Sequence, residues 1–208
     1  TGETVEGDGG GGSDDRDVTG GSRRNGAGDA DIGGGLVASS SDDATVKYAG
    51  SVSVREFFRV EAAGEVDLTV RNPEITGGPL QVDAGGDATV DINGAGNAGI
   101  GGGQCTKAGG RATVDIKNQT IEGDVEIRAS TVDVLIQNTT VEGDLTVEVT
   151  GGDTGGGTGG GNGNGGGGSG NSVDIKNSTV EGGFTIVGDE AVDVSGCSNV
   201  QGRTPDAC

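Results

Sequence analysis

Short runs in which a polar residue separates two apolar residues recur along the chain from Glu65 onward. The copies with the clearest pattern are "VDIKNQTIEGDVEI" from Val114, "VDVLIQNTTVEGDLTV" from Val132 and "VDIKNSTVEGGFTI" from Val173. Successive side chains of a β-strand point to opposite faces, so the valines and isoleucines of a run share one face and the aspartates take the other. The pattern predicts strands, because no stretch of it has the 3.6-residue period of an amphipathic helix.

Internal repetition dominates the chain beyond residue 65. Successive copies carry an aspartate at 24, 24, 18, 41 and 19 residues from the previous one, and the interval of 41 contains a glycine-rich insertion, residues 151–170. The recurring aspartates are Asp67, Asp91, Asp115, Asp133, Asp174 and Asp193. A period near 20 residues fits one coil of a solenoid in which each repeat contacts only its neighbours.

We therefore predict an all-β fold, a single-stranded, right-handed parallel β-helix of about six coils in which like residues stack on like. In one coil, the inward residues are expected to be Val114, Ile116, Ile121, Val125 and Ile127. In the next coil, the same positions are expected to hold Val132, Val134 or Ile136, Val141, Leu145 and Val147.

The composition divides the rest of the chain. Residues 1–43 are acidic, rich in glycine and poor in large apolar side chains, so we expect a flexible arm or one that a partner orders. Residues 44–64 hold three of the four aromatic residues and alternate in places, which predicts a strand region that caps the N-terminal end. The β-helix is expected over residues 65–204, followed by a short tail, residues 205–208.

The pattern Val-X-Ile-X-Asn-X-Thr-Val-X-Gly resembles the repeat of parallel β-helices of the pectate-lyase type, and "IEGDVEI" and "VEGDLTV" resemble bactofilin coils. The resemblance covers residues 65–202, about two thirds of the chain. The pectate-lyase-like type is favoured, because a polar turn asparagine recurs and the period exceeds the compact spacing of bactofilins. The resemblance implies an architecture and not an activity, since such solenoids occur among lyases, adhesins, cytoskeletal polymers and surface proteins.

The charge balance is strongly acidic, with 33 Asp and Glu against 13 Lys and Arg and a net charge of −20. Such a surface repels nucleic acid and is typical of halophiles, where molar salt shortens the Debye length to about 3 Å; a calcium binder is the alternative. The absence of histidine excludes His-based triads and His-containing zinc sites. The sequence has no apolar run long enough to span a membrane, and its first residue, Thr1, suggests a removed export signal.

The three cysteines fit an exported protein with one disulfide and one remaining thiol. Cys197 and Cys208 are the natural local pair, and Cys105 is left for a bridge between subunits. The alternative is three unpaired thiols in a reducing cytoplasm.

An asparagine recurs at the expected turn of each coil, at Asn72, Asn118, Asn138 and Asn177. Asparagine tolerates the left-handed conformation that such a turn requires. Asn118, Asn138 and Asn177 also begin Asn-X-Thr sequons, which makes them candidate N-glycosylation sites, whereas Pro73 excludes Asn72. A buried asparagine ladder could not accept a glycan, so the structural and the glycosylation hypotheses compete.

The aspartates are expected to form one outward column with neighbours about 4.8 Å apart. A second acidic column would consist of Glu122, Glu142 and Glu181. We favour a solvated halophilic face, with Lys117 and Lys176 as local charge compensation. The alternative is a cation site, for which Asp115, Asp133 and Asp174 are weak metal-ligand candidates. No firm metal or cofactor is expected beyond non-specific cations.

These observations favour a non-enzymatic structural subunit of an extracellular, haloarchaeal surface filament or sheath. The subunits would form a homopolymer by β-helix stacking or strand exchange, because the ends of a solenoid present unpaired strand edges. The alternatives are a glycan-binding or polysaccharide-lyase-like β-helix and a bactofilin-like cytoskeletal polymer.

Overall fold

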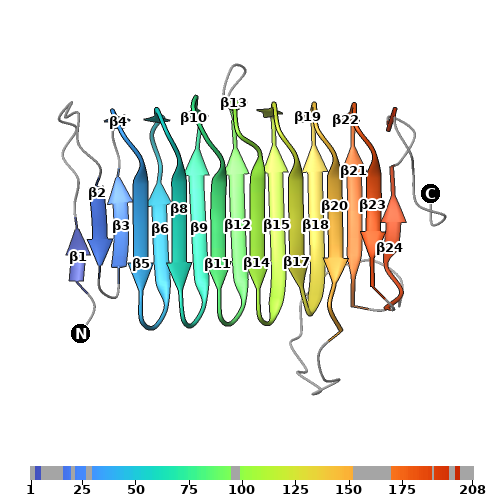
Figure 1. Cartoon of the computed structure of the whole chain (residues 1–208), viewed down its shortest axis with the longest axis horizontal. Helices are drawn as coiled ribbons and strands as arrows, with labels where there is room; N and C mark the ends of the chain where they lie inside the picture. The colour runs from blue at the N-terminus through green and yellow to red at the C-terminus, as the bar shows by residue number, and fades with distance from the viewer. Residues whose placement is uncertain are drawn as a thin grey trace.

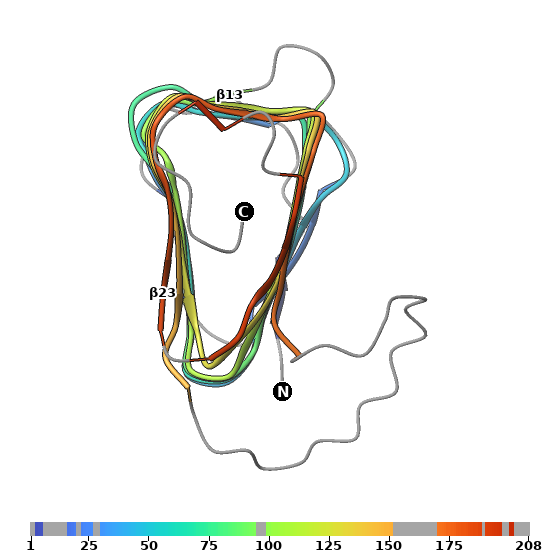
Figure 2. The same cartoon turned by 90° about the vertical axis from the view of Figure 1, so that its right-hand side faces the viewer.

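The computed structural model describes residues 3–5, 16–19, 22–26, 30–94, 99–151, 170–188, 190–196 and 200–201, with side chains from residue 31 onward. These residues form a parallel β-solenoid of about six turns and contain no helix, which confirms the predicted architecture. The turns follow one another in chain order along the long axis, from β1 to β24 (Figure 1). Viewed along that axis, the turns superpose into a triangle with two long sides and one short side (Figure 2). The right-handed sense of the coil stays a prediction.

Each turn contributes one strand to each of three sheets. Sheet A, one long side, consists of β1 (Glu3–Val5), β3 (Ser22–Gly26), β6 (Ala44–Tyr48), β9 (Val66–Arg71), β12 (Ala88–Asn93), β15 (Arg111–Lys117), β18 (Thr131–Gln137), β21 (Ser172–Lys176) and β24 (Asp193–Ser195). Sheet B, the short side, consists of β4 (Ala30–Ile32), β7 (Val52–Val54), β10 (Pro73–Ile75), β13 (Gly99–Ile100), β16 (Thr120–Ile121), β19 (Thr140–Val141) and β22 (Thr179–Val180). Sheet C, the other long side, consists of β2 (Arg16–Thr19), β5 (Leu36–Ser40), β8 (Phe58–Ala62), β11 (Leu80–Ala84), β14 (Gln104–Ala108), β17 (Val125–Ala129), β20 (Leu145–Val149) and β23 (Phe184–Val187).

A narrow aliphatic core fills the triangle, because every strand turns its apolar side chains inward. All five residues predicted as the inward set of one coil are at most 1% exposed: Val114, Ile116, Ile121, Val125 and Ile127. Each stacks on an apolar residue of the next coil in a continuous column. The two-residue period of the sequence and the burial in the structure therefore agree.

The expectation that Val132 takes the position of Val114 was wrong, as the pairing of β15 with β18 shows. Val114 pairs with Val134 and Ile116 with Ile136, whereas Val132 pairs with Ala112. This register puts the longest apolar side chains of both strands into contact and keeps the turn asparagines of the two coils aligned. The two strands begin at the same coil position, but the Val-Asp-Val motif of β18 lies two residues earlier in its coil than the Val-Asp-Ile motif of β15.

The solenoid also extends further toward the N-terminus than the sequence predicts. Within the expected arm, β4 and β5 join sheets B and C, and Leu36 is fully buried. Residues 44–64, the expected cap, form an ordinary coil (β6, β7 and β8) that pairs with a coil on each side. In β5, Ala38 takes the inward position that Val60 and Val82 hold in the next two coils, so this strand lacks the alternating large apolar residues that mark the later coils.

The aromatic residues lie in this early coil and not over its end. The rings of Tyr48 and Phe58 meet edge to face with centroids 6.1 Å apart, inside the core. Phe57 lies over Gly35 of the preceding coil, where an added Cβ would come within 2.5 Å of its ring. The predicted insertion 151–170, apart from its two end residues, and the predicted tail lie outside the described residues.

Candidate functional surfaces

The outer face of sheet A carries the predicted aspartates, but the expectation of one column was wrong. Strand pairing places Asp115 opposite Leu135 of the next coil and Asp133 opposite Thr113 of the previous one. Within the predicted set, Asp91 and Asp115 alone are direct partners. The aspartates are divided between two neighbouring columns, which separates most like charges by more than one strand spacing.

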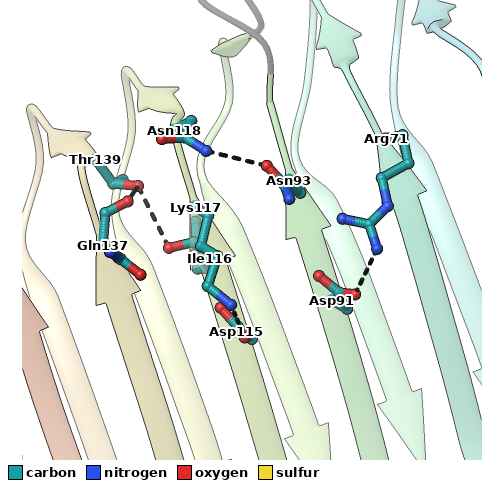
Figure 3. A network of polar contacts seen from close by, with 9 residues as sticks. All are labelled: Arg71, Asp91, Asn93, Asp115, Ile116, Lys117, Asn118, Gln137 and Thr139. Atoms are coloured by element: carbon teal, nitrogen blue, oxygen red, sulfur yellow. Dashed lines mark hydrogen bonds and ion pairs between the residues drawn. The ribbon is translucent and has the colours of Figure 1, made fainter.

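Five of these aspartates have a cationic partner on the same face, and we call this set the paired face. The partners are Lys47 for Asp67, Arg71 for Asp91, Lys117 for Asp115, Arg111 for Asp133 and Lys176 for Asp174. Figure 3 shows two of the pairs on adjacent strands. The predicted charge compensation by Lys117 and Lys176 is therefore confirmed. Because the charges are partly exposed, each pair contributes only about 0–1 kcal/mol to stability.

Asp174 shows how the paired face affects ionisation. Partial burial is the largest single influence and raises its pKa. Hydrogen bonds from Lys176 and Ser195, together with the charge of Lys176, outweigh burial and leave the pKa of Asp174 below its ordinary value. The hydroxyl of Ser195 donates to Oδ1 at 2.8 Å. The carboxylate is thus stabilised in its ionised form by its own coil and by the next one.

The three weak metal-ligand candidates are not brought together. Asp115, Asp133 and Asp174 lie in three successive coils, and each is held by a different cation. In the part of the chain that the structure describes, no group of three or more Asp, Glu, Cys or His side chains could hold a metal ion. The arrangement of these aspartates therefore supports charge compensation on a surface better than chelation.

The recurring asparagines lie at the corner between sheets A and B, in the conformation that the sequence predicts. Asn72, Asn118, Asn138 and Asn177 have φ values of 47°, 54°, 50° and 48°, the left-handed region that asparagine tolerates best after glycine. The side chains form part of a ladder: Nδ2 of Asn138 donates to Oδ1 of Asn118 at 3.2 Å, and Nδ2 of Asn118 donates to Asn93 at 3.1 Å (Figure 3). The turn role of these residues is confirmed.

The ladder runs along the outside of the corner, so the structural and the glycosylation hypotheses do not exclude each other. Asn118, Asn138 and Asn177 are exposed, whereas the residue after each one points inward. Those inward residues are polar and buried, at 2–4% exposure: Gln119, Thr139 and Ser178. The hydroxyls of Thr139 and Ser178 donate to backbone carbonyls and so secure the corner from inside.

The corner between sheets B and C carries carboxylates in three successive coils, and we call it the acidic corner. It consists of Glu122, Asp124, Glu142, Asp144 and Glu181, all of them exposed. Backbone hydrogen bonds from Glu142 to Ile121 and from Glu181 to Val141 keep the coils in register. No lysine or arginine of the described residues forms an ion pair with these carboxylates.

The aspartates of the acidic corner have a backbone role that sequence analysis missed. Asp124 Oδ1 accepts the amide N–H of Asp144 at 2.8 Å, and Asp144 Oδ1 accepts that of Gly183 at 2.6 Å. At the corner between sheets C and A, Asp43 accepts the N–H of Glu65 and Asp87 that of Arg111. In the sequence, each of these aspartates stands directly before the first apolar residue of a strand, and this position could have revealed the backbone role.

Cys105 is the only cysteine among the described residues, and its thiol is free. It lies half-buried on the outer face of sheet C, in β14, with four strands of sheet C on the N-terminal side and three on the C-terminal side. Burial, followed by the charge of Glu126, raises its pKa, while Lys107 opposes the shift. Cys197 and Cys208 lie outside the described residues, so their predicted disulfide stays a prediction. The lateral position of Cys105 does not suit a bridge across an end-to-end contact.

A hollow lies on the outside of sheet C, within the described residues. It is lined mainly by Ser39, Ser40 and Ser41 of one coil with Glu61 and Asp83 of the next two. Arg59 forms an ion pair with Glu61 at its edge. The hollow is polar and has no aromatic side chain on which a sugar ring could stack.

Comparison with known proteins does not assign this chain to a family. No protein-family model, no curated protein and no solved structure matches this chain. Within the described residues, no helix is long and apolar enough to cross a membrane.

Proposed function

We propose that the protein is a non-enzymatic structural subunit of an extracellular filament or sheath, and that its subunits assemble end to end. The observation that carries the proposal is the partial exposure of apolar side chains at the C-terminal end of the rod. There several inward-facing apolar residues are less covered than their strand partners in the preceding coil. Partly buried residues at this end are Ile186, Val192, Val194 and Val200.

The contrast with the preceding coil is direct. Val194 pairs with Val173 and Val200 with Val180, both of which are at most 1% exposed. Ile186 pairs with Val147, which is fully buried. Burial of apolar surface contributes roughly 25 cal/mol per Å², so a further coil placed on this end would gain free energy.

An outward position at the same end supports the proposal independently. Val187 is 46% exposed and is the only large apolar side chain of the described residues that is exposed. In earlier coils its position on sheet C holds charged residues, among them Lys107, Arg128 and Glu148. A valine at this position fits a surface that another chain covers.

The partner that fits best is a second copy of this chain. All three sheets are parallel, and β1, β2 and β4 form the N-terminal edges of the same sheets whose C-terminal edges are β24, β23 and β22. The two ends therefore present complementary strand edges of one triangular cross-section, and strand edges without a partner favour pairing with another chain.

Secretion and adaptation to high salt are part of the same proposal, as is surface glycosylation. The net charge of −20 and the unpaired acidic corner support a protein that works in concentrated salt. Asn177 is the most suitable glycan acceptor, because its exposed amide makes no hydrogen bond to any described residue. Intact mass of the protein from its native source tests glycosylation, and agreement with the sequence mass would exclude it.

Electron microscopy and sedimentation in molar salt test the assembly. We expect rods longer than one subunit, and we expect Val187→Asp to shift the population to monomers. Thr146→Asp adds the same charge to the outer face of sheet C one coil earlier and should leave assembly unchanged. Wild-type protein that stays monomeric at every concentration would overturn the proposal. If both variants reduced assembly equally, the C-terminal end would be excluded as the contact surface between subunits.

A further inference from the structure

One strand interrupts the aliphatic core in the middle of the rod. In β14 the inward residues are Gln104 and Thr106, which are 1% and 0% exposed. Gln104 stacks between Leu80 and Val125, and the other positions of its column in coils with described side chains are also apolar. The column of Thr106 is likewise apolar in both neighbouring coils. These two columns of sheet C therefore become polar in this single coil.

The polar pair satisfies itself only in part. Nε2 of Gln104 donates to the hydroxyl of Thr106, but Oε1 of Gln104 has no hydrogen-bond partner. The other buried oxygen without a partner in the described residues belongs to Asp115, on the outer face. An unsatisfied acceptor in a core of low polarity destabilises the folded state, because it has lost its hydrogen bonds to water.

The pairing of the same strand with the next coil is one residue pair shorter than its pairing with the previous coil. Four residue pairs join β14 to β17, whereas five join β11 to β14 and five join β17 to β20. Ala108, the last residue of β14, is only partly buried, while Ala129 at the same position of the next coil is fully buried. Fewer pairs and a polar core thus coincide in one strand.

We propose that β14 is the strand at which the rod opens locally. In a solenoid, each coil is stabilised only by its own packing and by its two interfaces, so a defect in one coil lowers stability there and not elsewhere. Coils on both sides of β14 keep apolar columns and hold together when β14 detaches. Opening at this strand exposes the edges of β11 and β17 and releases Cys105 from its half-buried position. The inference is independent of end-to-end assembly.

Hydrogen exchange followed by mass spectrometry tests the opening. The matched comparison is between residues 105–107 of β14 and residues 146–148 of β20, which hold the same coil positions two coils later and do not border β14. We expect amides of β14 to exchange about 10–100-fold faster than those of β20, the range that one unsatisfied buried polar group produces. Equal exchange in the two segments would overturn the proposal.

Three variants test whether the polar pair causes the opening. Gln104→Leu restores the apolar column and should slow exchange in β14 by about tenfold or more, whereas Thr106→Val removes the partner of Gln104 Nε2 and should speed exchange further. Leu80→Gln adds a buried polar residue one coil earlier and should speed exchange in β11 as well as in β14. A Gln104→Leu protein that folds but exchanges in β14 as fast as the wild type would contradict the assignment.

Discussion

The paired face and the acidic corner place carboxylates on the same coils but treat their charge differently. On the paired face, five aspartates each meet a lysine or arginine of the same sheet. At the acidic corner, five carboxylates have no cation among the described residues, and two of them accept backbone N–H groups instead. The repeat thus stacks like charges at the acidic corner without a compensating side chain. The repulsion between these carboxylates is reduced only by dissolved salt and by the backbone N–H groups that two of them accept.

The glycines of the acidic corner should be more sensitive to substitution than any charge. A Cβ added at Gly143 would lie 2.6 Å from the carbonyl carbon of Gly123 and 2.7 Å from the amide nitrogen of Asp124. Because both atoms belong to the backbone, we expect Gly143→Ala to lower the free energy of unfolding by about 1–3 kcal/mol in urea titrations. Gly170→Ala is the control, since nothing lies within 4 Å of its Cβ. Equal losses would show that the corner is not closely packed.

Neutralising the acidic corner should stabilise the protein at low salt. Unit charges at the spacing of neighbouring strands repel by about 1 kcal/mol in water and less in strong salt. We expect Glu122→Gln, Glu142→Gln and Glu181→Gln together to raise the melting temperature in dilute buffer and to have little effect in molar salt. The matched triple variant Asp91→Asn, Asp115→Asn and Asp133→Asn leaves its cations unpaired and should give no such gain. A gain from both triples would mean that net charge alone matters.

The smallest effect is expected from the pH dependence of the paired face. The pKa of Asp174 is lowered on folding, so its ionised form contributes stability above its ordinary value of 3.8, and that contribution is lost as pH falls through the folded value. Asp174→Asn should therefore be less stable than the wild type at neutral pH, with the difference shrinking below about pH 4. Unfolding monitored by circular dichroism from pH 7 to pH 2 measures it. A difference that is constant with pH would exclude ionisation as the cause.

Much of the coil could be predicted, because apolar and polar residues alternate along a strand that has one buried face. Val114 and Ile116 alternate with polar residues, and Asn118 follows at the turn, so local pattern alone placed each of them correctly. The strands within residues 1–43 were missed, since Ile32, Leu36 and Ala38 reach the core from an acidic, glycine-rich segment without forming a conspicuous apolar run. Gln104 was missed for the opposite reason: a polar residue in a polar-looking stretch gives no sign that it is buried.

The sequence by itself determined the parallel β-solenoid, its turn asparagines and its acidic surface, because these depend on the period of the chain and on residue chemistry. Only the tertiary structure decided which coil position stacks on which, since register follows from the fit of apolar side chains across coils. That register divides the aspartates between two columns, aligns the glutamates of the acidic corner and places Gln104 between Leu80 and Val125. The same residues in another register would carry the same charges and a different surface.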